Sequence, residues 1–481
     1  MAAELAEGGM DVVLIEEGPV MRTEDYGEDI TDMMTRIMRE AGTSAIVGRA
    51  PISYLEGRCV GGSTVINGGM CWRTPPRVLH RWRMEHGLVD LTPEALEPVF
   101  VHVERRIQAR HQDPGSEGLN NLVFKRGCDR LGYRVVRNVR NQVHCVGTND
   151  CPLGCPSGAK QSTLLSHVPI VLRHGGAVYS GCRVQRILVE GGRAAGVVAR
   201  VEAPDGSRKG HRRLTVRAPT VVLACGATQT PLLLLRNRLC NGSGQVGRNF
   251  TLHPNVKVLA LFDEEIDSLR GAHQAFQCHE FQDEGILLAP GGVPPAMISV
   301  GFDAIGREHA ALMKAYRHMA TGGVLVDDTT SGRVRLGPFG MPILRYDVSD
   351  HDQRRFIRAV GLLAEVYFAA GARKVFTAFR HVPPLQGPDD IRRLFTHPPR
   401  VEDTEYFTAH IMGTCRMDAD PHRGVVGPTG QTHELPGLYV ADASVLPTPL
   451  GVNPQETIMA LATRTAWHIL DARGTRRPQA V

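Results

Sequence analysis

The sequence predicts an α/β protein in which a second domain is inserted into a dinucleotide-binding domain. Residues 1–9 read as the end of a helix closed by glycine, and residues 11–18 as a buried strand that ends in two acids. Residues 220–225 are continuously apolar and stop at Gly226, which is typical of a central strand covered on both faces. Because residues 437–472 return to a strand, a Gly/Pro loop and a helix, we expect the segment before them to form the inserted domain.

Three further elements follow from local sequence. Thr92 precedes Pro93 and predicts the N-cap of a helix. Residues 184–201 predict a β-hairpin, and a further turn is expected at residues 204–206. Apolar residues at helical spacing between 356 and 368 predict a helix, which Gly371 ends.

Composition excludes several classes of protein. A chain of 481 residues is long enough for two or three domains. The 55 Lys and Arg residues against 50 Asp and Glu leave a net charge of +5, too weak and too scattered for a nucleic-acid-binding surface. Neither a membrane span nor a secretion signal is readable, so we expect a cytoplasmic protein. Eleven cysteines, an odd number, favour reduced thiols or a metal site over a disulfide framework.

The two acids that end the first predicted strand are Glu16 and Glu17. In a dinucleotide-binding unit an acid at this place hydrogen-bonds a ribose hydroxyl, and we assign that role to Glu16. The first strand of such a unit, with its Gly-x-Gly-x-x-Gly turn, would lie upstream of Met1. A truncated chain that holds no dinucleotide and performs no catalysis is therefore an alternative.

A loop rich in glycine and small residues covers residues 57–76. Its glycines would let backbone N–H groups approach a ring or a pyrophosphate without a Cβ in the way. Taken singly, each of these glycines is equally well explained by an ordinary turn.

Five separated segments together resemble the glucose-methanol-choline family of flavin-dependent oxidoreductases. The resemblance runs in order over nearly the whole chain, and the joint match is far more specific than any one segment. The segments are the strand at 11–18, the loop at 57–73, Ala-Cys-Gly-Ala-Thr-Gln-Thr-Pro at 224–231, His-Ile-Met-Gly-Thr-Cys-Arg-Met at 410–417, and the run from 437 to 458 that contains Gly-Val-Asn-Pro-Gln-Glu-Thr-Ile.

The resemblance implies FAD bound in a discontinuous Rossmann-like domain at residues 1–255 and 403–481. It also implies a substrate domain at residues 256–402, with a mostly antiparallel sheet backed by helices. By the same comparison Asn67 to Met70 lie along the flavin, Val184 covers the adenine, and Asp442 with Ala443 lies beside the ribityl phosphate. The remaining residues expected to contact the cofactor are Val60, Gly61, Gly62, Gly68, Gly69, Gly226, Asn453, Pro454 and Thr457.

His410 is the candidate catalytic base. Removing a hydride from an alcohol carbon requires the hydroxyl proton to leave, and a neutral imidazole can accept it. Asn453 would supply a second polar group that fixes the substrate oxygen, and Pro454 would preset the turn that aims it. Many relatives carry His at this second position, and because this chain has Asn453 there, His410 would be the lone base. The alternative is that His410 is a structural histidine.

Three cysteines, Cys145, Cys151 and Cys155, lie in one loop with the spacing Cys-x5-Cys-x3-Cys. Three soft ligands without a fourth suit a three-iron cluster or an incomplete zinc site. The spacing is similar to that of bacterial FAD-dependent glucose dehydrogenases, whose loop holds a [3Fe-4S] cluster that passes electrons to a cytochrome. Buried reduced thiols without a metal are the alternative.

The resulting hypothesis is oxidation of an alcohol, with a long-chain alcohol or a sterol favoured over a sugar. The electron acceptor is left open among oxygen, a quinone and a cytochrome. A sugar dehydrogenase with an iron-sulfur cluster, and a relative that uses FAD only structurally for cyanohydrin cleavage, are the alternatives.

Overall fold

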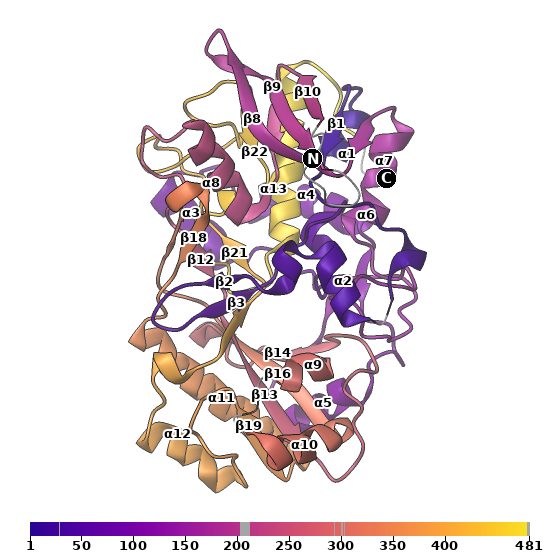
Figure 1. The fold of residues 1–481 in the computed structure, drawn as a ribbon, viewed down its shortest axis with the longest axis vertical. Coiled ribbons are helices and arrows are strands. Elements are labelled where there is room, and N and C mark those ends of the chain that lie inside the picture. Colours follow the sequence, from indigo (N-terminus) through magenta and orange to yellow (C-terminus); the bar gives the residue numbers. More distant parts are fainter. Residues whose placement is uncertain (28, 203–211, 293, 300–301, 303, 479–481) are drawn as a thin grey trace.

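The computed structural model describes residues 1–478, apart from 28, 203–211, 293, 300–301 and 303. Two bodies of secondary structure lie one above the other along the longest axis of the molecule (Figure 1). The predicted turn at 204–206 lies outside the described residues. The fold is α/β, with helices packed on both parallel and antiparallel sheets, as the sequence predicts.

The larger body is built on a nine-stranded sheet whose order is β2-β3-β20-β13-β16-β15-β14-β5, with β19 also paired to β13. All of its pairings are antiparallel except the one between β3 and β20. Its strands are β2 (Ala45–Ile46), β3 (Ile52–Tyr54), β5 (Val135–Arg137), β13 (Asn255–Leu261), β14 (Phe276–Cys278), β15 (Ile286–Pro290), β16 (Met319–Val326), β19 (Lys374–Thr377) and β20 (Tyr406–Thr408).

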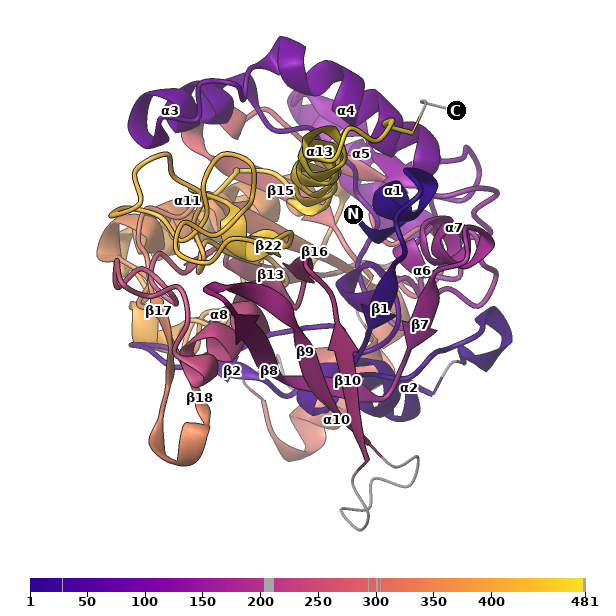
Figure 2. The same cartoon turned by 90° about the horizontal axis from the view of Figure 1, so that it is seen from above.

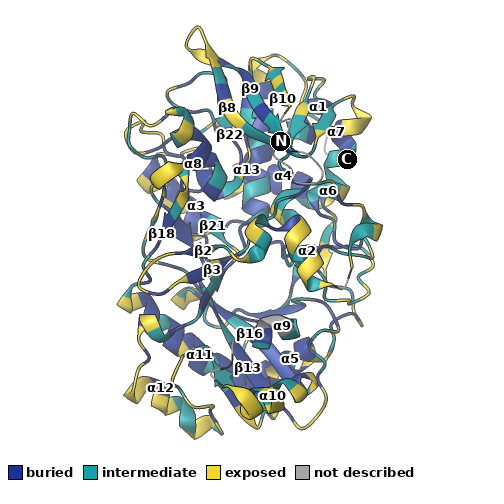
Figure 3. Cartoon of the chain, viewed as in Figure 1, coloured by how far each residue is buried: buried dark blue, intermediate teal, exposed yellow. Residues whose placement is uncertain are grey.

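One face of this sheet packs on two helices, α5 (Leu119–Leu131) and α11 (Asp350–Ala370), which share its buried apolar cluster (Figure 3). Gly371 ends α11 in the left-handed conformation, as predicted. The sheet also takes strands from outside residues 256–402, so the predicted domain boundary stays a prediction. Three short helices complete this body: α9 (Pro295–Ser299), α10 (Gly306–Lys314) and α12 (Arg393–Thr396).

The other body contains two parallel strand pairs and a three-stranded antiparallel sheet. The parallel pairs are β1 (Val13–Ile15) with β7 (Ala177–Tyr179), and β11 (Val221–Leu223) with β22 (Leu438–Val440). The antiparallel sheet contains the predicted hairpin, β8 (Cys182–Glu190) and β9 (Arg193–Val201), with β10 (Arg213–Arg217).

Helices surround these strands (Figure 2). Helix α4 begins at Pro93, and the Thr92 side chain accepts a hydrogen bond from the Ala95 N–H, which confirms the predicted cap. A second buried apolar cluster joins α4, α8 and α13 to β11 and β22. The helices of this body are α1 (Ala2–Glu7), α3 (Pro76–His86), α4 (Pro93–Arg106), α6 (Thr163–Ser166), α7 (Val168–Arg173), α8 (Gly226–Asn237) and α13 (Gln455–Ala472).

The first strand differs from its prediction. Sequence predicts a buried strand over residues 11–18, whereas β1 has three residues and Val13 keeps 39% of its surface exposed. Within the described residues β1 pairs along one edge only, with β7, so its side chains are covered from fewer directions than those of a central strand.

The remaining elements lie between or beside the two bodies. Helix α2 (Ile30–Ile37) starts at a capping Asp29. Three two-stranded ladders follow: β4 (Ala109–His111) with β6 (Val139–Asn141), β12 (Thr251–Leu252) with β21 (Ile411–Met412), and β17 (Arg333–Leu336) with β18 (Pro342–Arg345). Among the described residues, no helix combines the length and the apolar character needed to cross a membrane.

Candidate functional site

A two-residue ladder brings two histidines together from distant parts of the chain. Leu252 pairs with Ile411, so the next residue after β12, His253, lies beside the residue before β21, His410. The two rings meet edge to face, with centroids 5.2 Å apart at 88°. The sequence pattern points to His410 but not to His253, which is 1% exposed.

The hydrogen bonds of His253 determine which of its nitrogens carries the proton. Nε2 accepts the backbone N–H groups of Leu450 and Gly451, each at 3.1 Å. Neutral His253 therefore carries its proton on Nδ1, and this atom lies 3.2 Å from Nδ1 of His410. It follows that His253 donates to His410 and that neutral His410 carries its own proton on Nε2.

Nε2 of His410 faces Asn453, whose amide nitrogen is 3.3 Å away. In this structure the Asn453 amide oxygen accepts from Gln277 at 3.5 Å. Because Nε2 of His410 bears the proton in this tautomer, a half-turn of the Asn453 amide would bring its oxygen to His410 and its nitrogen to Gln277. Burial, followed by the charge of His253, lowers the pKa of His410 to about 3. His410 is thus neutral near pH 7 and lies against a buried Asn453, and the catalytic roles predicted for the two residues stay predictions.

The glycine loop lies against the start of α13. The Asn67 side chain donates to the Gln455 side chain and accepts the N–H of Gly69 at 3.1 Å. Gln455 in turn donates to the Met70 carbonyl at 3.4 Å. These contacts hold two segments that the sequence assigned to the flavin, residues 67–70 and the residues after Asn453, in direct contact.

Two buried cations hold the backbone of this loop. Lys160 Nζ donates to the carbonyls of Val65 at 2.6 Å and Asn67 at 2.9 Å. Arg140 donates to the Gly68 carbonyl through Nε at 2.9 Å and Nη2 at 2.7 Å. Burial lowers the pKa of Lys160 to about 8, against the charges of nearby thiols. No local pattern in the sequence assigns a role to Arg140 or Lys160, although Lys160 follows Cys155 by only five residues.

At the far end of the candidate site, the two acids after β1 have separate roles. Glu17 pairs with Arg39 at 3.1 Å and with Arg58 at 3.2 Å. Glu16 accepts the N–H of Gly18 at 2.8 Å, and burial raises its pKa to about 7. Glu17 is therefore committed to ion pairs, which leaves Glu16 as the acid free to accept further donors.

The carboxyl end of β11 lies close to the acids that follow β1 and β22. Cys225 is exposed to solvent, yet the surrounding protein, followed by the charges of Asp442 and Glu16, raises the pKa of its thiol to about 12. The ends of β1, β11 and β22 are therefore neighbours, and a doubly wound fold places its ligand at the carboxyl ends of its strands.

Asp442 itself is used by the fold. One carboxylate oxygen accepts the N–H of Gly226 at 3.0 Å and the hydroxyl of Thr230 at 2.5 Å, and the other accepts the N–H of Ser444 at 2.8 Å. Asp442 thus joins the start of α8 to the turn after β22. Its predicted cofactor contact stays a prediction.

The other predicted cofactor residues lie along the same segments. Gly61 and Gly62 are left-handed, and Gly62 and Gly226 have no atom within 4 Å of a Cβ placed on them. Val60 and Thr457 are buried, and the Thr457 hydroxyl bonds Thr74 at 2.8 Å. Val184 is half-buried in β8, and the first residue of this strand, Cys182, donates its N–H to the Glu16 carbonyl at 2.8 Å. Ala443 lies in the turn after β22, and Pro454 directly precedes α13.

These features fit FAD. The acid Glu16 suits ribose hydroxyls, and the open backbone at Gly62 suits a pyrophosphate. The loop at 67–70, which Gln455 joins to the segment after Asn453, suits a flat ring. Of the predicted cofactor residues, Asp442 and Thr457 already form hydrogen bonds within the protein through their side-chain oxygens.

The predicted iron-sulfur cluster is not supported. Within the described part of the chain, no three His, Cys, Asp or Glu side chains converge as metal ligands would. The sulfur of Cys151 accepts from Arg140 at 3.1 Å, and that of Cys155 accepts the Lys160 N–H at 3.4 Å. Cys145, Cys151 and Cys155 line one common cavity, but this cavity measures only about 10 Å³.

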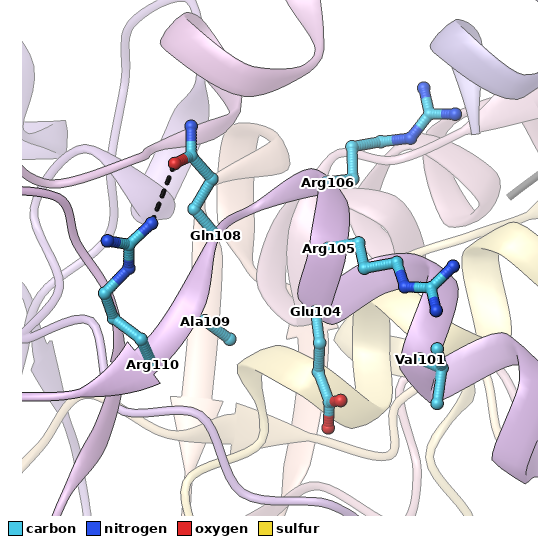
Figure 4. Close-up of a pocket in the computed structure, with 7 residues that line it drawn as sticks. All are labelled: Val101, Glu104, Arg105, Arg106, Gln108, Ala109 and Arg110. Atoms are coloured by element: carbon cyan, nitrogen blue, oxygen red, sulfur yellow. Dashed lines mark hydrogen bonds between the residues drawn. The ribbon is translucent and has the colours of Figure 1, made fainter. Parts of the chain in front are cut away.

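A larger hollow of about 570 Å³ lies elsewhere, between the end of α4 and β4 (Figure 4). Its lining is polar, and the Arg110 side chain bonds that of Gln108 at 3.0 Å. None of the residues predicted for the site lines it. This hollow is therefore separate from the segments to which the sequence assigns the cofactor.

Comparison with known proteins gives a consistent picture. Two models of the GMC oxidoreductase family match residues 34–255 and 328–462. An uncharacterized GMC-type oxidoreductase of Mycobacterium tuberculosis is 34% identical over 97% of this chain and 73% of its own length. Another from Sinorhizobium fredii is 31% identical over 100% of this chain and 94% of its own length.

More distant relatives have named activities. A long-chain-alcohol oxidase of Arabidopsis thaliana is 26% identical over 96% of this chain and 64% of its own length. Among solved structures, pyridoxine 4-oxidase from Mesorbium loti shares the fold at a TM-score of 0.72 and 18% identity, over 97% of this chain and 96% of that one. The family models and the relatives above 30% identity show that the chain is an oxidoreductase and belongs to the GMC oxidoreductase family.

Proposed function

We propose that this protein oxidises an alcohol CH–OH group, with FAD held between the loop at 61–70, the ends of β1, β11 and β22, and the start of α13. Bound FAD would supply the hydride acceptor. The observation that carries the proposal is the contact between His410 and Asn453, in which the amide nitrogen lies 3.3 Å from Nε2 of the ring. Gln455, two residues after Asn453, bonds Asn67 and Met70 of the loop. A half-buried imidazole and a buried amide at this place are suited to hold one hydroxyl group.

The two side chains would hold the hydroxyl group in a defined orientation. In the tautomer that His253 favours, the Nε2–H of His410 donates to the substrate oxygen, and the Asn453 amide oxygen accepts the hydroxyl hydrogen. An N–H aimed at the oxygen stabilises negative charge there as the hydride leaves the adjacent carbon. The base role that sequence predicts for His410 needs its other tautomer and stays a prediction, decided by the pH experiment below.

A long-chain alcohol as substrate and oxygen as electron acceptor are proposed from the relatives. Curated relatives that match 96–98% of this chain are named long-chain-alcohol oxidases, although this chain covers only 64–66% of their length. The alternative of a sugar dehydrogenase depends on an iron-sulfur cluster that accepts electrons. Because the cluster is not supported, this alternative is not supported either.

The first experiment is anaerobic mixing of the purified protein with a long-chain primary alcohol while flavin absorbance is followed. The flavin is expected to bleach, and His410→Ala is expected to slow bleaching at least about 100-fold. His397→Ala, at an exposed position on the far side of the larger body, serves as control. A colourless protein would support the non-catalytic alternative, and a coloured protein that no alcohol bleaches would support cyanohydrin chemistry.

The pH profile of flavin reduction separates the two roles of His410. A base with a pKa near 3 is fully deprotonated across the neutral range, so the rate would not change with pH there. If His410 only donates its N–H, the hydroxyl proton leaves to solvent, and the rate is expected to rise with pH. A flat profile would establish His410 as the base.

A further inference from the structure

A β-hairpin outside the candidate site carries an apolar tip. Strands β17 and β18 are joined through Pro338–Gly340, and Figure 2 shows the hairpin reaching out from the body of the molecule. Phe339 is fully exposed at 103% of its reference area, and Met341 is 63% exposed. An isolated exposed apolar side chain is ordinary, but two of them at the end of a projecting hairpin form a local apolar tip.

The backbone of this tip is held in an unfavourable conformation. Phe339 has φ 56° and ψ 20°, the left-handed region that a bulky residue rarely occupies. The Gly340 carbonyl is fixed by Arg236 of α8 at 3.2 Å. Phe339 therefore points into solvent although its left-handed backbone costs conformational free energy. Glycine would adopt the same backbone conformation without that cost.

The stem of the hairpin has one buried face and one basic face. Val334 pairs with Leu344, and both are buried in the cluster of the larger sheet. On the other face Arg333 pairs directly with Arg345, an arrangement of like charges that destabilises a ladder.

The charges on this face are available to a ligand. Arg333 and Arg335 are exposed and make no ion pair with any residue that the structure describes, while Arg345 reaches Asp347 at 3.3 Å. Arg238, at the end of the neighbouring α8, is also exposed. An apolar tip above a cluster of arginines is complementary to a surface that is apolar inside and negatively charged outside.

We propose that the hairpin at residues 333–345 docks the protein on an anionic lipid surface. Phe339 and Met341 would enter the interface between headgroups and acyl chains, and Arg333, Arg335 and Arg345 would face the headgroup phosphates. Arg335 lies in β17, whereas Phe339 lies in the turn that follows this strand, so the arginine is set back from the tip towards the body of the molecule. The proposal concerns binding alone and does not depend on the reaction.

The proposal is tested by sedimentation of the FAD-loaded protein with two kinds of vesicle, one of phosphatidylcholine alone and one that also contains phosphatidylglycerol. Binding is expected to the anionic vesicles and to weaken with salt. The double variant Phe339→Ser with Met341→Ser is expected to reduce binding at least about tenfold, because two apolar side chains no longer bury their surface in the lipid. The double variant Met84→Ser with Phe395→Ser removes the same two residue types from exposed positions elsewhere and is expected to bind normally.

The arginines are tested separately. Arg333→Gln and Arg335→Gln are each expected to weaken binding about fivefold, the effect of one cation near an anionic surface. Arg354→Gln, an exposed arginine on α11, serves as the charge control. Flavin reduction in free solution and the unfolding temperature report whether each variant is intact.

Two outcomes would overturn the proposal. Equal sedimentation of the wild type and the tip variant would show that the tip does not touch lipid. A wild-type dimer that the tip variant converts to a monomer, without any vesicle binding, would show that the occupant is a second copy of the chain.

Discussion

His253 is the residue on which the candidate site depends most directly. It accepts two backbone N–H groups and donates to His410, so removing its ring leaves Leu450 and Gly451 without an acceptor. A buried unsatisfied donor costs about 1–3 kcal/mol. We expect His253→Phe to lower the free energy of unfolding by about this amount per donor and to slow flavin reduction.

His253→Gln is the matched variant, since its amide oxygen can accept one of the two N–H groups. It is expected to recover part of the stability in urea unfolding while leaving the position of His410 altered. Normal flavin reduction in both variants would show that His253 has no influence on His410.

Glu16 and Glu17 allow a second residue-level test, because they are adjacent and have different partners. Glu16→Gln is expected to weaken FAD binding about 10-fold or more, the scale of one hydrogen bond to a charged group. Glu17→Gln breaks the pairs with Arg39 and Arg58 and is expected to lower stability with little effect on FAD affinity. Fluorescence titration of the apoprotein with FAD measures both, and the reverse order of effects would assign the ribose contact to Glu17.

At the scale of elements, helix α13 carries a buried acid one turn from Asn453. Burial, followed by hydrogen bonding to Glu104, raises the pKa of Glu456 to about 9, and Arg73 holds Glu104 as the charged partner at 2.6 Å. Between its unfolded pKa of about 4.3 and its folded pKa, the folded state binds more protons at this residue than the unfolded state. Its contribution therefore lowers stability progressively as pH rises through that window.

Glu456→Gln removes this contribution while keeping the shape of the side chain. The difference in unfolding free energy between variant and wild type is expected to shift in favour of the variant as pH rises from 5 towards about 9. Urea unfolding at several pH values checks it, and a pH-independent difference would show that Glu456 is already charged in the folded state.

Sequence predicted the elements with strong local signals. The cap at Thr92, the end of α11 at Gly371 and the hairpin of β8 and β9 are set by short-range rules and were confirmed. The buried first strand was wrong in its burial, because burial depends on neighbours that local sequence does not specify. His253, Arg140 and Lys160 were missed for the same reason, since their partners lie far away in the chain.

At the scale of the whole molecule, the candidate FAD site joins segments from the first and the last residues of the chain. A ligand that binds only the folded state stabilises it by about 2.7 kcal/mol at 100 times its dissociation constant. We expect removal of FAD to lower the unfolding temperature and to increase cleavage by protease near residues 61–70. An unchanged unfolding temperature in apoprotein that rebinds FAD would contradict this.

The N–H groups of Leu450 and Gly451 donate to His253, which lies two residues before β13 of the nine-stranded sheet. These bonds connect the sheet of one body to the apolar cluster of the other, which contains Leu450. Swinging the two bodies apart would strip both N–H groups of their acceptor, at a cost of about 1–3 kcal/mol each. Such a hinge motion would rarely occur in the finished protein. Flavin incorporation is therefore expected to accompany folding, and exchange of bound for free flavin afterwards is expected to be slow.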